Sequence, residues 1–360
     1  MHACTEPQRA RAAAGRRAVA AVVVGTVVGL VASACGGDAA AAAHLSAAES
    51  AAAPPRHSPA RAAPDSALWL QMRNVDLHID ERAVLHITRL HGHVVPAAAG
   101  APPVLDDTKS FKVRVTSGEV SLTGPDLSVL LNKFVFNYPG APLKRLRVRM
   151  AGTQLVQTGV LHKGVDVRFE ITSTPTLEPD GRVRLHPTKT RILGIDGQRL
   201  LHALGLRLDD MLDLRKARGA SVKGDDLFLE PTEILPPPAI EGRLASIRIE
   251  GDRIVQTFVR VPDDSVFGTY VRPDSSAENF VYFRGARLRF GKLLMTDTDL
   301  QIIDADARDP FDLNLEQYNR QLVAGTSRTL PNLGLQVMMP DYRTVGRPAP
   351  TVAGATGSRP

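Results

Sequence analysis

The chain has 360 residues, of which 43% are hydrophobic and 23% charged, as in a folded protein of one or two domains rather than a disordered or polytopic membrane chain. Its formal net charge of +6 falls to +3 when residues 1–34 are set aside, because that segment holds four arginines and one glutamate. A remainder so balanced argues against nucleic acid as the main partner.

The N-terminal segment predicts export. A basic stretch, an apolar run and small residues at its end are the parts of a signal peptide, and here they are Arg9, Arg11, Arg16 and Arg17, then residues 18–34 closing on Ala32-Ser33-Ala34. Cys35 follows directly and resembles the cysteine of a lipobox, although Ala32 stands where that pattern favours leucine. The resemblance implies a signal peptide over 1–34, lipid attachment at Cys35 and anchoring to a membrane.

Two alternatives remain open at this end of the chain. Plain cleavage after Ala34 would release the protein, and an uncleaved run would anchor it, since the run approaches the ~20 residues that span a bilayer. The cysteine count favours the lipoprotein. Cys4 would leave with the signal, so Cys35 would be the single thiol of the mature chain, and acylation would remove that free thiol from an oxidising compartment.

Composition then divides the rest of the chain. Residues 35–66 are rich in Ala, Pro and Ser, and residues 343–360 in Pro, Gly and Thr, so both predict disordered segments, a tether and a tail. Between them we expect a domain over 67–269 and a β-rich C-terminal extension over 270–342. The expected location is the periplasmic side of a membrane in the cell envelope.

Strict alternation of apolar and polar residues predicts strands through most of the folded part. It occurs in 75–80, 111–116, 165–172, 183–186 and 247–250. A period of two means that one face of a sheet is buried and the other wet, which is typical of antiparallel sheets. Turn residues at 178–181 and 250–252 separate pairs of these runs and predict hairpins.

Helical periodicity interrupts the strands in three places. Residues 126–138 follow a capping-box spacing of Thr123 and Asp126, residues 197–216 are rich in leucine, and a short helix is expected near 313–322. This order of elements predicts an α+β fold in which a long, curved antiparallel sheet packs on helices.

The stretch from Lys109 to Val259 resembles the LmeA-like, TULIP-type (tubular lipid-binding) envelope proteins. The resemblance rests on the strand-to-helix step SGEVSLTGPDLSVLLN, on the meander over 155–192, and on the leucine-rich segment and strand pair that follow. It implies a curved sheet wrapped on a helix, with an apolar groove that holds phospholipid acyl chains.

The groove lining expected from this resemblance is Leu127, Leu130, Leu131, Phe134, Val167, Phe169, Ile171, Leu204 and Leu208. Headgroup contacts are expected from Lys144, Arg147, Arg182 and Arg184, because basic strand faces attract anionic lipids. The alternatives are ordinary core packing for the apolar residues and a solvated strand face for the basic ones.

Other chemistry has weak signals. His86, His91 and His93 lack further ligands at a known metal spacing, and Asp304, Asp306, Asp309 and Asp312 lack the glycine and glutamate of an EF-hand, so solvated or capping acids are expected there. No nucleophile elbow is present. We therefore expect no metal, no cofactor and no enzymatic activity, and a protein that binds or shuttles a phospholipid or other amphiphile. An envelope scaffold is the alternative, and a hydrolase of envelope polymers the third.

Overall fold

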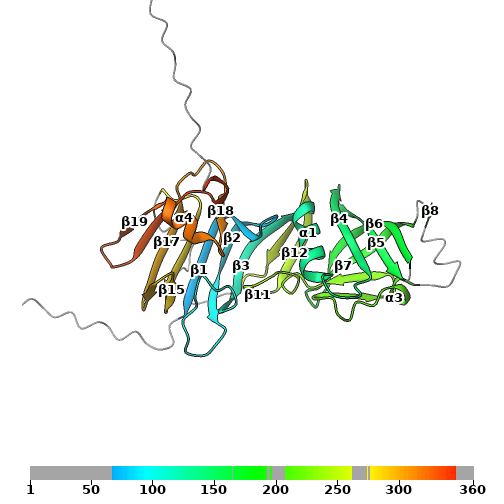
Figure 1. Cartoon of the computed structure of the whole chain (residues 1–360), viewed down its shortest axis with the longest axis horizontal. Helices are drawn as coiled ribbons and strands as arrows, with labels where there is room; N and C mark the ends of the chain where they lie inside the picture. Colours follow the sequence, from blue (N-terminus) through cyan, green and yellow to red (C-terminus); the bar gives the residue numbers. More distant parts are fainter. Residues whose placement is uncertain are drawn as a thin grey trace, which may run out of the picture. The chain divides into compact units, whose positions relative to one another are not determined.

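The computed structural model describes residues 67–163, 165–192, 195–196, 207–261, 274 and 276–345, and strands dominate them (Figure 1). Cys35, the expected signal peptide and tether, and most of the expected tail lie outside the described residues. The strands form a sheet of eleven, a sheet of seven and a two-stranded hairpin of β15 (Leu288–Phe290) and β16 (Leu293–Met295). The one long sheet predicted from the sequence is thus divided in two.

The eleven-stranded sheet has the order β12-β13-β3-β2-β1-β14-β17-β20-β19, with β11 beside β3 and β18 beside β1. Its strands are β1 (Leu68–Asp80), β2 (Ala83–Pro96), β3 (Phe111–Thr123), β11 (Ala239–Glu241), β12 (Leu244–Glu250), β13 (Arg253–Phe258), β14 (Phe280–Gly285), β17 (Thr298–Asp304), β18 (Phe311–Asn314), β19 (Thr326–Thr329) and β20 (Leu335–Met339). Because β14 pairs with β1, the segment expected as a C-terminal extension continues the same sheet as the first strands.

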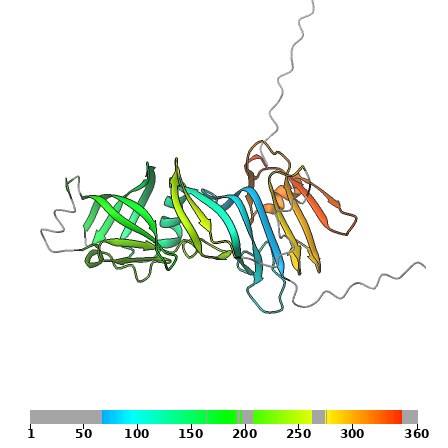
Figure 2. The same cartoon turned by 180° about the vertical axis from the view of Figure 1, so that it is seen from behind.

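The seven-stranded sheet is antiparallel throughout and follows the order β4-β5-β6-β7-β10-β9, with β8 beside β7. Its strands are β4 (Leu143–Ala151), β5 (Gln154–Lys163), β6 (Val165–Leu177), β7 (Val183–Ile192), β8 (Ile195–Asp196), β9 (Ala220–Lys223) and β10 (Asp226–Leu229). These strands curl, as both views show (Figures 1 and 2). A curved antiparallel sheet is therefore present, as predicted.

The predicted turns and the first predicted helix are confirmed. The turn at 178–181 joins β6 to β7, and the turn at 250–252 joins β12 to β13, with Gly181 and Gly251 at φ +90° and +60°, where a side chain would be strained. Helix α1 (Gly124–Leu130) starts at a capping box of Thr123 and Asp126 and continues as one π-helical turn, η1 (Leu131–Val135).

The other two predicted helices are shorter than expected. In the described part of 197–216, only α3 (Leu208–Met211) is helical, and Leu212 and Leu214 lie buried in chain without regular secondary structure beyond it. The helix expected near 313–322 begins only at α4 (Tyr318–Ala324), because Leu313 lies in β18 and pairs with β1. A short 3₁₀ turn, η2 (Tyr342–Thr344), ends the described chain.

Helix α1 is fastened to the curved sheet by polar contacts as well as by packing. The Ser128 hydroxyl accepts a hydrogen bond from the Val148 N–H at 2.8 Å, and the Asn132 amide bonds both the N–H and the carbonyl of Leu146 at 2.9 and 2.7 Å. The apolar side chains of α1 join the main core cluster, which takes residues from both large sheets. Among the described residues, no helix is long and apolar enough to cross a bilayer.

Candidate functional site

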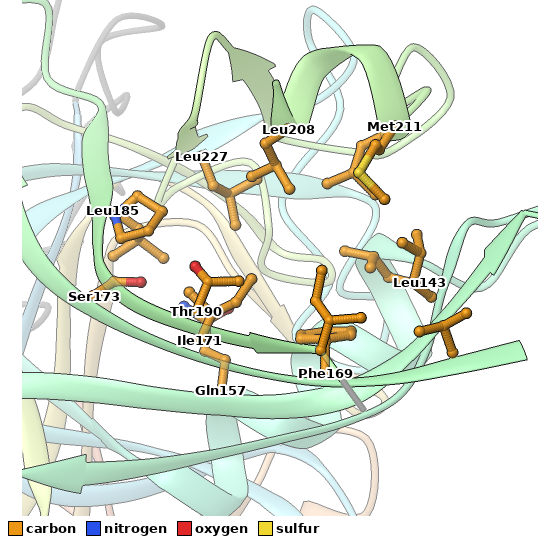
Figure 3. Close-up of a pocket in the computed structure, with 15 residues that line it drawn as sticks. Leu143, Gln157, Phe169, Ile171, Ser173, Leu185, Thr190, Leu208, Met211 and Leu227 are labelled. Atoms are coloured by element: carbon orange, nitrogen blue, oxygen red, sulfur yellow. The ribbon is translucent and has the colours of Figure 1, made fainter. Parts of the chain in front are cut away.

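The inner face of the curved sheet encloses an apolar cavity with an empty volume of about 700 Å³, including the space that opens to solvent (Figure 3). None of the described side chains that line it is ionisable. These lining residues are Leu143, Gln157, Leu161, Val167, Phe169, Ile171, Ser173, Leu185, Pro187, Thr190, Ile192, Leu208, Met211, Leu212 and Leu227. The centre of a water molecule can occupy about 60 Å³ of this space, several times the ~10–15 Å³ that one water needs.

Strand alternation explains which residues line the cavity. Every second residue of β6 from Val167 to Ser173 lines the cavity, beside residues of β5 and β7. Ile171, for example, lies between Gln157 of β5 and Thr190 of β7, while Phe169 lies between Gly159 and Ile192. The wall is thus built of cross-strand rows of inward-facing residues.

Gly159 gives the Phe169 ring its place on this wall. A Cβ atom at position 159 would stand 3.0 Å from Cζ of Phe169 and 2.8 Å from Cδ2 of Leu146, both too close for unstrained contact. The ring therefore lies over the glycine backbone. A larger residue at 159 would push the ring away from the wall, so the width of the cavity depends on this glycine.

The opposite side of the cavity is formed by Leu208 and Met211 of α3 together with Leu227 of β10 (Figure 3). This short helix is held to the loop between β9 and β10. The Leu208 N–H donates to the Asp225 carboxylate at 3.0 Å, and the Gly224 N–H donates to that of Asp209 at 2.6 Å. Four helical residues thus obtain a defined position from hydrogen bonds to a hairpin rather than from helix length.

Only part of the lining expected from the sequence meets at this cavity. Val167, Phe169, Ile171 and Leu208 do line it. Leu127, Leu130 and Leu131 are instead buried in the core, and Phe134 packs against that core, while Leu204 lies outside the described residues. The helix stripe is therefore core, whereas the strand residues face the cavity.

Most of the wall contributed by β5 and β7 is not among the residues predicted from the sequence. Gln157, Leu161 and Ile192 stand beside the predicted β6 positions, but only the cross-strand register brings them together, and the period of a single strand does not reveal that register. The hairpin turn at 178–181 sets this register only as far as Ser173 and Pro187, because an irregularity between Thr172 and Ser173 shifts the pairing by one residue along the rest of the wall.

Two of the basic residues expected at the headgroup lie on the other face of the sheet. Lys144 and Arg147 pair with Val160 and Thr158, and these two alternate with the cavity-lining Gln157 and Leu161. Both cations are exposed and form no ion pair with another described residue.

The other two expected headgroup cations are already paired. Arg182 and Arg184 each lie 2.8 Å from a carboxylate, those of Asp180 and Asp226 respectively. The four expected cations therefore do not form a common site with the cavity.

The histidines do not meet as a metal site. Nδ1 of His86 lies 2.6 Å from the Asp76 carboxylate, and its Nε2 lies 3.7 Å from that of Asp126. His93 packs against the Trp69 ring at 3.9 Å between centroids, and His91 pairs with Gln71 of β1. In the part of the chain that the structure describes, no group of three His, Cys, Asp or Glu residues is placed to hold a metal ion.

Two of the acids expected to be solvated are buried instead. Asp304 and Asp312 are only 4% and 6% exposed, because both lie in strands of the large sheet. Asp312 hydrogen-bonds His78, and Asp304 accepts a bond from the Asn279 amide at 3.0 Å. The expectation was wrong for these two because long-range pairing of β17 and β18 could not be seen locally.

Asp341, next to this cluster, gives a prediction on pH and stability. Burial raises the pKa of its carboxyl to about 6, against a hydrogen bond from the Asp312 N–H that lowers it, and the nearby acids raise it further. Between about pH 4 and 6 the folded state keeps a proton that the unfolded state loses, so stability falls as pH rises through this window.

Asp341→Asn is therefore expected to leave stability unchanged near pH 4 and to raise it by about 1 kcal/mol above pH 6, a value reduced for solvent screening. Denaturant unfolding at both pH values measures this difference. Asp297→Asn, at an exposed position, is the matched control. An equal effect of Asp341→Asn at both pH values would contradict the assigned shift.

Comparison with protein-family profiles, with curated proteins and with solved structures returned no significant match. A function for this chain is therefore inferred from the cavity and from the features of its sequence.

Proposed function

We propose that this chain is a lipid-anchored protein of the cell envelope that binds or shuttles a phospholipid or other amphiphile in the cavity of the curved sheet, as its resemblance to TULIP-type proteins implies. The apolar, unfilled inner face of β5, β6 and β7 is the observation that supports this. In a structural core, facing side chains would fill this space at close-packed density. Here acyl groups would take their place, each buried CH₂ contributing ~0.8 kcal/mol.

Native mass spectrometry of the detergent-free protein tests the proposal directly. The expected spectrum contains a mass increment of one amphiphile per chain. Delipidation is then expected to lower the melting temperature, and phospholipid at about 100 times its Kd to restore about 2.7 kcal/mol of stability by mass action. If the protein purifies without a bound amphiphile and added phospholipid does not change its melting temperature, the alternative of an envelope scaffold is favoured instead.

The anchor has its own test. Cys35→Ser is expected to move the mature protein from the membrane to the soluble fraction, because no acyl chain is attached. Cell fractionation and incorporation of labelled fatty acid measure the change, with Cys4→Ser as the control that retains the label. A wild-type chain without label, together with a variant that stays in the membrane, would show that Cys35 is not the anchor.

A further inference from the structure

Three polar side chains interrupt the apolar wall of the cavity, and they come from adjacent strands. Gln157 and Thr190 flank Ile171 in one cross-strand row, and Ser173 stands two residues farther along β6 (Figure 3). Their residues are only 9%, 8% and 1% exposed. Each of the three belongs to the lining of the cavity.

These side chains have no hydrogen-bond partners within the described part of the chain. No hydrogen bond among the described residues involves the side chain of Gln157, Ser173 or Thr190, and their polar atoms are not among the fully buried ones, so they are accessible from the cavity. Their neighbours in the wall are apolar, so the cavity is the space from which a partner can come. The unused hydrogen-bonding capacity points to a group on the ligand.

The chemistry of the wall restricts what that group is. An amide and two hydroxyls both donate and accept hydrogen bonds, so they match a hydroxyl, an ester or an amide. None of the described lining side chains ionises, so an anion placed there would have no counter-charge and would lose its hydration. The partner group is therefore uncharged.

The position of these three residues places the rest of the ligand. Val167 lies four residues before Ile171 on β6, a distance of ~13 Å along the strand, and the wall between them is the Phe169 ring. Val165, at the start of the same strand, is 67% exposed. An alkyl chain along Val167 and Phe169 thus reaches from the exposed end of β6 to the polar row.

We propose that the cavity selects amphiphiles whose alkyl chain carries an uncharged hydroxyl, ester or amide group, and that Gln157, Ser173 and Thr190 hold that group. This inference rests on the proposed function and specifies its ligand class. Acyl esters, acyl amides and long-chain alcohols are bound in preference to hydrocarbons and fatty-acid anions of equal length.

A competition assay on the purified full-length chain tests this inference. Decanol, chlorodecane and decanoate are compared for their ability to displace a bound fluorescent alkyl probe, and decanoate is used at a pH where it is ionised. Decanol is expected to bind about tenfold more tightly than either of the others, as one or two hydrogen bonds provide. Thr190→Val combined with Gln157→Leu removes the polar groups at nearly constant shape. This variant is expected to lose about tenfold in decanol affinity and to keep its affinity for chlorodecane.

Thr158→Val is the matched control, because Thr158 follows Gln157 on β5 and points to the opposite face. It is expected to change none of the affinities. If the double variant does not fold, Thr190→Val and Ser173→Ala are read singly. The inference would be overturned if decanol, chlorodecane and decanoate bound equally well to the wild type, or if the substituted protein kept its preference for decanol. If neither the fluorescent probe nor any of the three compounds bound, the proposed function itself would be rejected.

Discussion

Ile171→Trp is expected to abolish most amphiphile binding while leaving the fold intact. Ile171 lies in the middle of the cavity wall, between Gln157 and Thr190, and an indole there would occupy the space of an alkyl chain. Excluding even three buried CH₂ groups at ~0.8 kcal/mol each lowers affinity roughly 50-fold. Native mass spectrometry gives the bound fraction, and circular dichroism with thermal melting checks the fold.

Leu130→Trp is the control for this prediction. Leu130 is fully buried in the core cluster and does not line the cavity, so the larger side chain has no free space to enter. Overpacking is expected to cost about 1–3 kcal/mol of unfolding free energy, without changing the affinity of the molecules that remain folded. Normal binding by Ile171→Trp, or loss of binding by a folded Leu130→Trp protein, would place the ligand elsewhere.

Asp126→Ala is expected to be among the most destabilising single substitutions, at about 2–4 kcal/mol. The Asp126 carboxylate accepts hydrogen bonds from the Val84 N–H at 3.0 Å and the Thr123 N–H at 2.9 Å, and it faces His86. It therefore caps α1 and joins this helix to β2. Alanine would leave the buried Val84 N–H without its partner.

The pH dependence of this loss of stability follows from the pKa shifts of Asp126 and His86. Burial raises the pKa of Asp126, but hydrogen bonds from His86, Thr123 and Val84 outweigh it and lower the pKa to about 2. A lowered acid pKa stabilises the fold above the ordinary value near 3.8, and this stabilisation is lost as pH falls toward 2.

His86 shifts in the opposite direction. Burial lowers its pKa, but hydrogen bonds to Asp126 and Asp76 outweigh this and raise it. The stabilisation that His86 provides is fully present below its ordinary pKa of 6.5, and it is lost as pH rises through the pKa that His86 has in the folded state.

The loss caused by Asp126→Ala is therefore expected to be largest between about pH 4 and 6.5. Urea unfolding across this range measures it. Asp166→Ala is the control, since Asp166 also pairs with a histidine, His162, at 2.6 Å, but both are exposed. Exposed pairs of this kind contribute little to stability, because solvent screens them. Equal losses for the two variants would mean that burial of Asp126 does not matter.

Elements whose signals are local could be predicted from the amino-acid sequence. Alternation predicted strands at 111–116 and 165–172, which lie in β3 and β6. The turns at 178–181 and 250–252 and the capping box of Thr123 and Asp126 were also predicted. Each of these depends on side-chain period or on backbone geometry within a few residues, so tertiary contacts reinforce the signal rather than replace it.

Long-range pairing decided what the local signals could not. Leu313 fits a helical stripe, yet it lies in β18 because 311–314 finds a parallel partner in β1, more than two hundred residues earlier. Leu212 has helical spacing with Leu208, yet it lies beyond α3 and, like Leu214, reaches the core from chain without regular secondary structure. In both cases burial against a distant element outweighed a weak helical propensity.

The division between core and cavity likewise depends on long-range packing. Leu130 and Phe169 carry the same hydrophobic signal, but α1 packs into the core, whereas the inner face of β6 meets only the short helix α3. Likewise, the burial of Gln157, Ser173 and Thr190 together depends on the register of three strands. Hydrophobicity predicts that a side chain is buried on folding. Whether it packs against another side chain or faces a cavity depends on which elements lie next to it.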